Sequence, residues 1–124
     1  MKEQFVRTGM LVGEGGVDAL ASASVIVFGI GGVGSYVTEG LARAGVGRIT
    51  LVDKDTIDIS NINRQLPALH STVGRPKAQV MAERVADINP DCRIEAVQCF
   101  FLPDTADDFD FSTYDYVVDA IDNV

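Results

Sequence analysis

A glycine-rich segment, residues 29–35, joins an apolar run to a helical pattern and constrains the fold more than any other part of the sequence. The run before it, Ser24-Val-Ile-Val-Phe-Gly29, is short and continuous, which is typical of a strand buried on both faces. Beyond it, apolar residues at three- and four-residue spacing predict a helix that stops at Gly45 and Gly47: Val33, Tyr36, Val37, Leu41 and Ala44. A strand, a glycine turn and a helix N-terminus predict a cradle for phosphates, because glycines permit close approach and free N–H groups attract anions.

The rest of the chain alternates strands and helices. Residues 48–53 and 114–119 are apolar runs that predict strands, and residues 93–99 are a mixed run that predicts an edge strand. A second helix is expected to begin near Pro76 and to end before Asn89-Pro90. The sequence therefore predicts an α/β fold: a Rossmann-like, doubly wound, mainly parallel sheet with helices on both faces. Residues 1–22 are expected to form an N-terminal helical segment of one or two short helices beside the sheet.

The 124 residues fit a single nucleotide-binding domain, residues 1–124, and their 47% hydrophobic content is enough for one core. The chain ends at Val124, just beyond the last apolar run, where a doubly wound sheet normally continues. We therefore expect the N-terminal half of a larger fold, incomplete at its C-terminus. The last strand would then leave an edge that invites pairing with another chain.

The net charge of −8 argues against an overall field that attracts nucleic acid or an anionic membrane. The N-terminus has no signal-peptide pattern, and no stretch approaches the roughly 20 apolar residues of a membrane span. A cytoplasmic protein without a membrane span is therefore expected. Cys92 and Cys99 form no CxxC pair, so they predict neither a zinc site nor a disulfide.

An aspartate at the end of the second strand strengthens the prediction of a nucleotide site. It follows the last loop glycine by 19 residues, at a place where a carboxylate accepts hydrogen bonds from ribose hydroxyls. The alternative is a tight glycine turn followed by a capping aspartate. The residues expected to bind the nucleotide here are Gly29, Gly31, Gly32, Gly34, Ser35, Asp53 and Asp55. They leave NAD and ATP open, since both ligands present a ribose and phosphates.

Charged side chains outside the glycine loop favour ATP with Mg²⁺, because a triphosphate needs more positive charge than a helix dipole supplies. Arg64, Lys77 and Arg7 are candidate donors to phosphate oxygens, where they would also stabilise charge on a leaving pyrophosphate. Asp122, just after the third apolar run, is a candidate oxygen ligand for Mg²⁺. Each of these is more often a solvated surface charge when it occurs alone, but the loops after parallel strands converge at one edge of the sheet.

Five segments of the chain, taken in order, resemble the ThiF/MoeB/HesA family of adenylating enzymes, which are similar to ubiquitin-activating enzymes. The segments are Gly29-x-Gly-Gly-x-Gly34-Ser35, Asp53-x-Asp55, Asn61-Ile-Asn63-Arg64-Gln65, Val73-Gly-Arg-Pro-Lys77 and Asp119-Ala-Ile-Asp122-Asn123. The resemblance implies that Asp53 holds the ribose, that Arg64 and Lys77 contact phosphates, and that Asp122 serves Mg²⁺. It also implies that Arg7 acts across a homodimer on the partner's ATP. Three amide side chains are implied to order the site: Asn61, Asn63 and Gln65.

Within this family the chain is most similar to the branch that dehydrates threonylcarbamoyladenosine in tRNA to a cyclic form. The similar segments include residues 40–47, 78–84 and 88–92, which are helix faces and loops. The likeness implies activation of a carboxylate as an acyl-adenylate with loss of pyrophosphate, followed by ring closure by an internal nitrogen and release of AMP. The tRNA partner rests on this resemblance alone, because the acidic composition gives it no support.

Three alternatives remain open. A sulfur-carrier protein adenylyltransferase of the same family would act on the C-terminus of a ubiquitin-like protein. An NAD-binding oxidoreductase half-domain would use the same glycine loop and the same Asp53. A nucleotide-binding fragment that only dimerises would leave this chain inactive by itself.

Overall fold

The computed structural model describes residues 2–99 and 109–121. Four parallel strands form one sheet in the order β3-β2-β1-β4: β1 (Ser24–Phe28), β2 (Arg48–Val52), β3 (Arg93–Val97) and β4 (Tyr116–Asp119). The chain moves outward from β1 to β3 and then crosses to β4 on the other side of β1. The strand order therefore reverses between β1 and β4, and open α/β sheets bind ligands at such a point, outside the carboxyl ends of the strands.

The two central strands, β1 and β2, are almost completely buried, as continuous apolar runs predict. β3 is one edge of the sheet, which confirms the prediction for residues 93–99. β4 is the other edge, and two of its apolar side chains, Tyr116 and Val117, are exposed. The predicted Rossmann-like α/β fold with a parallel sheet is confirmed, and its strand ends shift by only one or two residues.

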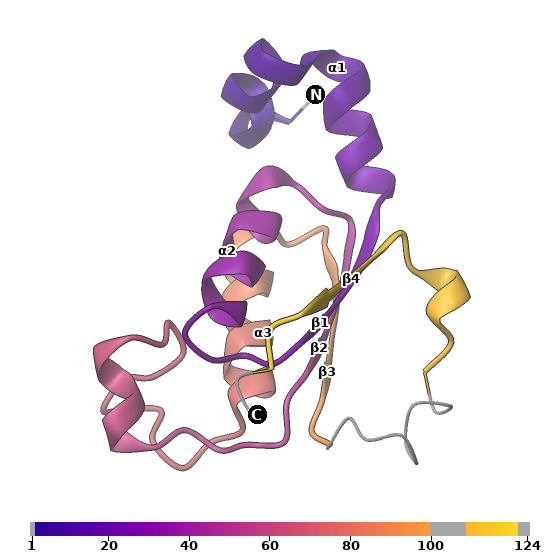
Figure 1. Cartoon of the computed structure of the whole chain (residues 1–124). Helices are drawn as coiled ribbons and strands as arrows, with labels where there is room; N and C mark the ends of the chain where they lie inside the picture. Colours follow the sequence, from indigo (N-terminus) through magenta and orange to yellow (C-terminus); the bar gives the residue numbers. More distant parts are fainter. Residues whose placement is uncertain (1, 100–108, 122–124) are drawn as a thin grey trace.

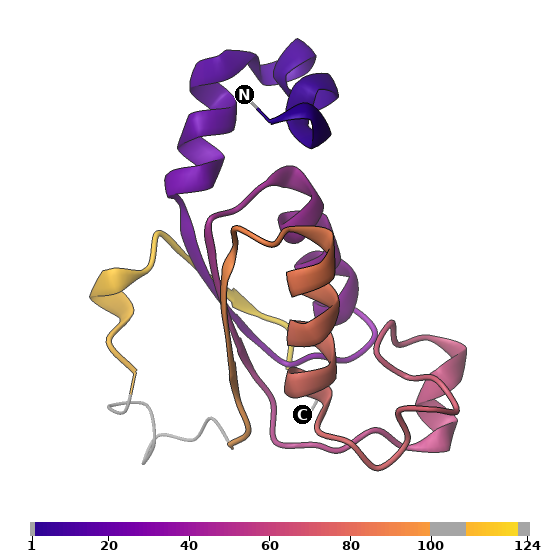
Figure 2. The same cartoon turned by 180° about the vertical axis from the view of Figure 1, so that it is seen from behind.

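Helices α2 (Gly34–Ala44) and α3 (Lys77–Ile88) cover one face of the sheet (Figures 1 and 2). The apolar residues that predicted α2 do not all face the sheet, because Val33 is 68% exposed and Tyr36 is 59% exposed. The buried face of α2 consists instead of small residues, Ser35, Thr38 and Ala42. The first turn of this helix lies against the backbone of the glycine loop, which leaves no room for a side chain at Gly34.

The other face of the sheet packs against the segment that leads into β4. Phe28 and Val52 contribute to this layer, and the ring of Phe109 meets that of Phe28 edge to face at 5.5 Å. The short 3-10 helix η4 (Phe111–Thr113) lies on the same side (Figure 1). Helical elements therefore lie on both sides of the sheet.

The N-terminal segment contains η1 (Glu3–Phe5) and α1 (Val6–Ser22). Gly13 has φ 74° and divides α1 into two helical pieces, as the prediction of one or two short helices allowed. These helices lie beyond the amino-terminal ends of the strands, because α1 leads directly into β1 (Figure 1). In the part of the chain that the structure describes, no helix has the length and apolar character needed to cross a membrane.

Candidate functional site

A cavity of about 670 Å³ lies at the carboxyl ends of β1, β2 and β4, where the strand order reverses. Its lining includes residues from the glycine loop, from the end of β2 and from the segment 61–65, which are separate in the sequence. Nine of the residues predicted from the sequence line it: Gly29, Gly31, Gly32, Asp53, Asp55, Asn61, Arg64, Gln65 and Lys77. The structure thus brings most of the predicted site together.

The glycine loop presents free backbone donors to this cavity. Its first residues are held in place, since the Gly29 N–H donates to the Val52 carbonyl at 2.9 Å. The N–H groups of Gly31, Gly32 and Val33 donate to no residue that the structure describes. All three lie just before α2, so the positive end of the helix dipole adds to their attraction for an anion.

Two of the glycines are required by the close approach of the backbone. Gly29 has φ 93°, and a Cβ at this residue would lie 2.7 Å from the Ala120 carbonyl oxygen. Gly34 does not line the cavity, but a Cβ there would lie 1.7 Å from the Gly29 carbonyl oxygen. Gly34 therefore lets α2 start directly against the loop, whereas Gly29 lets β1 turn beneath the end of β4.

Asp53 ties the glycine loop to the end of β2. Its Oδ2 accepts a hydrogen bond from the Ile30 N–H at 2.6 Å, and its Oδ1 accepts from the Asp55 N–H at 2.7 Å. The carboxylate is thus fixed in position at the cavity wall. A fixed carboxylate in this place is suited to the hydroxyl groups of a ribose, as the sequence predicts.

Lys77 is the buried cation of the site. It is the first residue of α3, and its side chain is only 8% exposed. Its Nζ lies 3.9 Å from Asp55 Oδ2, and its backbone N–H donates to the Asp55 carbonyl at 3.1 Å. Asp55 therefore holds the start of α3 and supplies a counter-charge for the ammonium group, which stays available to an anionic ligand because the pair is not in tight contact.

The segment from Asn61 to Gln65 includes the last three residues of the short helix η2 (Ile59–Asn63) and the two residues that follow it. Its start is fixed by a capping box in which Asn61 Oδ1 accepts from the Asp58 N–H at 2.8 Å. Arg64 is exposed at the cavity, where its guanidinium donates to Asn63 Oδ1 at 2.9 Å. Asn63 itself does not line the cavity, so in this structure it orients the arginine.

Gln65 carries an unsatisfied polar atom. The residue is 8% exposed, and its Oε1 is buried without a hydrogen-bond partner. Its Nε2 lies beside Gly31, at 3.5 Å from the place of a Cβ on that residue. A buried unpaired amide oxygen costs free energy, and a donor on a ligand in the cavity would satisfy it.

Three predicted residues need a separate account. Ser35 is completely buried and does not line the cavity, so we do not expect its hydroxyl to touch a nucleotide. Arg7 lies in the first turn of α1, at the opposite end of the sheet, and it does not line the cavity of its own chain. Asp122, the predicted Mg²⁺ ligand, lies outside the described residues. In the described ranges 2–99 and 109–121, no three His, Cys, Asp or Glu side chains form a metal-binding group.

The cavity also contains residues to which the sequence analysis assigned no role. Asp119 is the last residue of β4, as Asp53 directly follows β2, and the Oδ1 of Asp119 accepts a hydrogen bond from the Ile121 N–H at 3.2 Å. Its position at the end of an apolar run could have identified it as a site residue from the sequence. Phe28 and Cys99 line the cavity as well, but an apolar residue before a glycine and a cysteine after a strand carry no such signal.

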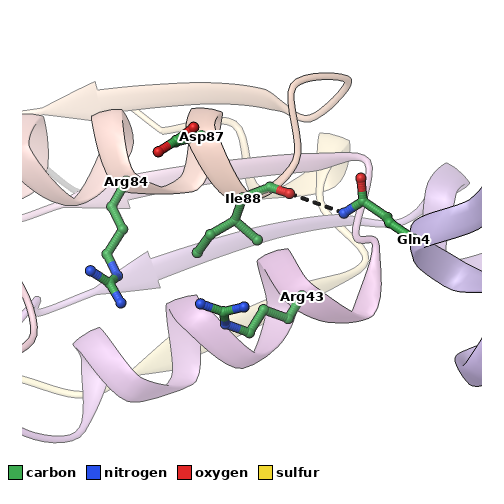
Figure 3. A pocket seen from close by; sticks show the side chains of 5 residues that line it. All are labelled: Gln4, Arg43, Arg84, Asp87 and Ile88. Atoms are coloured by element: carbon green, nitrogen blue, oxygen red, sulfur yellow. Dashed lines mark hydrogen bonds between the residues drawn. The ribbon is translucent and has the colours of Figure 1, made fainter.

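A second cavity, of about 610 Å³, lies between the C-terminal ends of α2 and α3 and η1 (Figure 3). None of the predicted site residues lines it. The Gln4 Nε2 donates to the Ile88 carbonyl at 3.0 Å across it. Its two arginines, Arg43 and Arg84, both pair with Glu39, so one carboxylate is shared between two guanidinium groups.

Comparisons with known proteins identify the family of the chain. Residues 5–124 match the ThiF family. The chain is 50% identical over 124 residues to the tRNA threonylcarbamoyladenosine dehydratase of Bacillus subtilis, covering 100% of this chain and 49% of that protein. It is 41% identical over 112 residues to the sulfur carrier protein adenylyltransferase of Thermus thermophilus, covering 90% of this chain and 41% of that protein.

Among solved structures, the chain is similar to the E. coli tRNA N6-threonylcarbamoyladenosine dehydratase in complex with ATP, with a TM-score of 0.93 and 47% identity. The match covers 98% of this chain and 50% of that one. The chain thus spans about half the length of the curated relatives that it matches.

Proposed function

The chain belongs to the ThiF family, and on this premise we propose that it forms the ATP-binding half of an adenylating enzyme that dehydrates threonylcarbamoyladenosine in tRNA. One observation supports ATP above all. The cavity at the carboxyl ends of the strands combines free N–H groups of the glycine loop with a buried lysine ammonium, which together suit a chain of phosphates.

The residues of the cavity fit the parts of ATP. The fixed carboxylate of Asp53 accepts hydrogen bonds from the ribose hydroxyls, and the N–H groups of Gly31 and Gly32 donate to phosphate oxygens. Arg64 and Lys77 add two positive charges to the lining of the cavity. The unpaired amide of Gln65 gains a partner when the ligand fills the cavity.

The proposed reaction transfers the adenylyl group to a carboxylate. The carboxylate oxygen attacks the α-phosphorus of ATP, the bond to the bridging oxygen breaks, and pyrophosphate leaves with that electron pair. Lys77 and Arg64 stabilise the charge that develops on the phosphate oxygens, and the rigid glycine loop holds the phosphorus in line with its attacker. An internal nitrogen of the substrate then closes a ring and releases AMP, so that water is lost overall.

Mg²⁺ would neutralise charge on the departing pyrophosphate, and Asp122 is the residue that we propose to hold it. Arg7, at the far end of its own sheet, would serve the site of a second subunit in a homodimer. Location in the cytoplasm is part of the same proposal, since tRNA and ATP meet there.

The test measures ligand binding by calorimetry on the full-length protein. Wild type should bind ATP with Mg²⁺, and Lys77→Met should weaken ATP binding about 10- to 100-fold, because a charge-assisted hydrogen bond contributes roughly 1.5–3 kcal/mol. Lys2→Met is the control, because Lys2 is an exposed lysine that pairs with Asp91. NADH binding without ATP binding would exclude the adenylation function and favour an NAD-dependent oxidoreductase.

The substrate is tested separately. The likeness to the sulfur carrier protein adenylyltransferase of Thermus thermophilus makes a ubiquitin-like sulfur carrier the second candidate. Release of pyrophosphate is measured with tRNA that carries threonylcarbamoyladenosine and with a sulfur carrier that has a free C-terminus. Stimulation by the tRNA alone is expected, and stimulation by the carrier alone would transfer the proposal to the second candidate.

A further inference from the structure

The buried hydroxyl of Ser35 connects two parts of the site that are 31 residues apart in the sequence. Its Oγ donates to the Gly31 carbonyl at 2.5 Å and accepts a hydrogen bond from the Leu66 N–H at 3.3 Å. The first bond is within the glycine loop and α2. The second reaches the end of the segment that carries Arg64 and Gln65.

The two parts joined by this hydroxyl both line the cavity and lie beside each other. A Cβ on Gly31 would lie 3.5 Å from Gln65 Nε2, and a Cβ on Gly32 would lie 3.8 Å from Arg64 Cγ. These two pairs are thus in close packing. The glycine loop carries the free N–H groups, and the facing segment carries the guanidinium and the unpaired amide.

We propose that Ser35 is a positioning residue that fixes the distance between the glycine loop and the segment 64–66, so that both contact one triphosphate at the same time. The inference rests on the proposed function, since the triphosphate is the ligand that needs both parts. Ser35 acts through Gly31 and Leu66 and does not touch the ligand. Without the hydroxyl the Leu66 N–H, on a half-buried residue, loses its acceptor, and the segment is free to move away from the loop.

Thr38 provides a matched control on the same helix. It is also completely buried, and its hydroxyl donates to the Gly34 carbonyl at 2.7 Å, four residues earlier, as Ser35 does to Gly31. Unlike the Ser35 hydroxyl, it accepts no hydrogen bond from another described segment. Ser35→Ala and Thr38→Val each remove one buried hydroxyl, but only the first removes the connection between the two parts.

The experiment measures binding of ATP and of adenosine to the full-length protein. In Ser35→Ala the dissociation constant for ATP should rise about tenfold while that for adenosine changes less than about twofold, because only ATP needs both phosphate-contacting parts. Thr38→Val should leave the ratio of the two constants unchanged. Equal ratios in Ser35→Ala and Thr38→Val would overturn the proposal, because a general loss of stability would affect both variants alike.

Amide hydrogen exchange provides a second readout that does not depend on ATP. Protection of the Leu66 N–H in the ligand-free protein should fall in Ser35→Ala and stay at the wild-type level in Thr38→Val. Ser35→Cys, which keeps a weak acceptor and the shape of the side chain, should give an intermediate result. Unchanged protection of Leu66 in Ser35→Ala or Ser35→Cys would refute the connection itself, whereas a wild-type protein that protects Leu66 but binds no ATP would refute only the proposed function.

Discussion

Two cavities of similar volume lie at opposite ends of the sheet, about 670 Å³ at the carboxyl ends of the strands and about 610 Å³ near the C-terminal ends of α2 and α3. They differ in how far their polar groups are satisfied. At the second cavity Glu39 pairs with both arginines, and Gln4 donates to a backbone carbonyl. At the first cavity the N–H groups of Gly31, Gly32 and Val33 and the amide oxygen of Gln65 have no partner in the described structure.

The difference indicates how a binding site can be distinguished from a structural groove. Satisfied polar groups stabilise the empty protein, and a ligand would have to break their bonds before it could bind. Unsatisfied groups cost stability in the empty protein and gain partners only when a ligand arrives. Volume alone does not separate the two cavities, but the state of their hydrogen bonds does.

The largest expected effect tests the packing that shapes the first cavity. Gly34→Ala places a Cβ 1.7 Å from the Gly29 carbonyl oxygen, so α2 must move away from the loop. We expect the free energy of unfolding in urea to fall by about 3 kcal/mol or more. Gly40→Ala is the control, because Gly40 is an exposed residue of the same helix with nothing within 4 Å of its Cβ position. Gly40→Ala should stabilise the protein by up to about 1 kcal/mol. An equal loss of unfolding free energy in both variants would mean that the close approach to Gly29 is not what destabilises Gly34→Ala.

A smaller effect of opposite sign tests the unsatisfied amide. Gln65→Met replaces the unpaired polar end by an apolar one of similar size, so the empty protein should become about 1 kcal/mol more stable while ATP binding weakens. Gln4→Met at the second cavity removes the hydrogen bond to the Ile88 carbonyl. It should lower the free energy of unfolding by about 0.5–1 kcal/mol without changing ATP binding. Urea unfolding and calorimetry measure the two quantities. The distinction between the cavities fails if both glutamine variants lose stability.

The smallest effect tests the paired charges of the second cavity. The hydrogen bond from Arg84, together with its charge, holds the pKa of Glu39 below the ordinary value of 4.5. A lowered carboxyl pKa stabilises the folded protein above pH 4.5, and this contribution is lost as the pH falls through the lowered value. Glu39→Gln should therefore cost roughly 0.5–1 kcal/mol at pH 7 and nothing in strong acid, since a partly exposed pair contributes little.

Its control is Glu14→Gln, since Glu14 is exposed and makes no ion pair with a described residue. The comparison is made by urea unfolding across the acid range. A difference between Glu39→Gln and wild type that persists at low pH would assign the stabilisation to packing and not to charge.

Much of the fold was predictable because it depends on local patterns. Continuous apolar runs gave β1 and β2, Pro76 and Asn89 delimited α3, and the mixed run 93–97 gave an edge strand. The buried face of α2 was not predictable from apolar spacing. Val33 and Tyr36 are exposed, whereas the buried face carries small residues and includes Gly34, which lies directly against the glycine loop.

The site residues also divide into those that local patterns predict and those that depend on the tertiary structure. Residues at the ends of strands, such as Asp53, were predictable because parallel strands bring their carboxyl ends to one edge. Ser35 was expected at the ligand because it follows the glycines, yet its hydroxyl bonds to Gly31 and Leu66. Lys77 was recognisable as a cation, but its burial follows from the position of α3 against the end of β2.

The sequence by itself determined the order of strands and helices, the glycine turn before α2 and the side chains that end each strand, because these depend on neighbouring residues and on the period of the apolar pattern. Only the tertiary structure decided which polar groups find partners. A hydrogen bond such as that between Leu66 and Ser35 joins segments far apart in the chain, and no local pattern records whether such a partner is near. Packing therefore divided the polar residues into those that hold the protein together and those left free to bind a ligand.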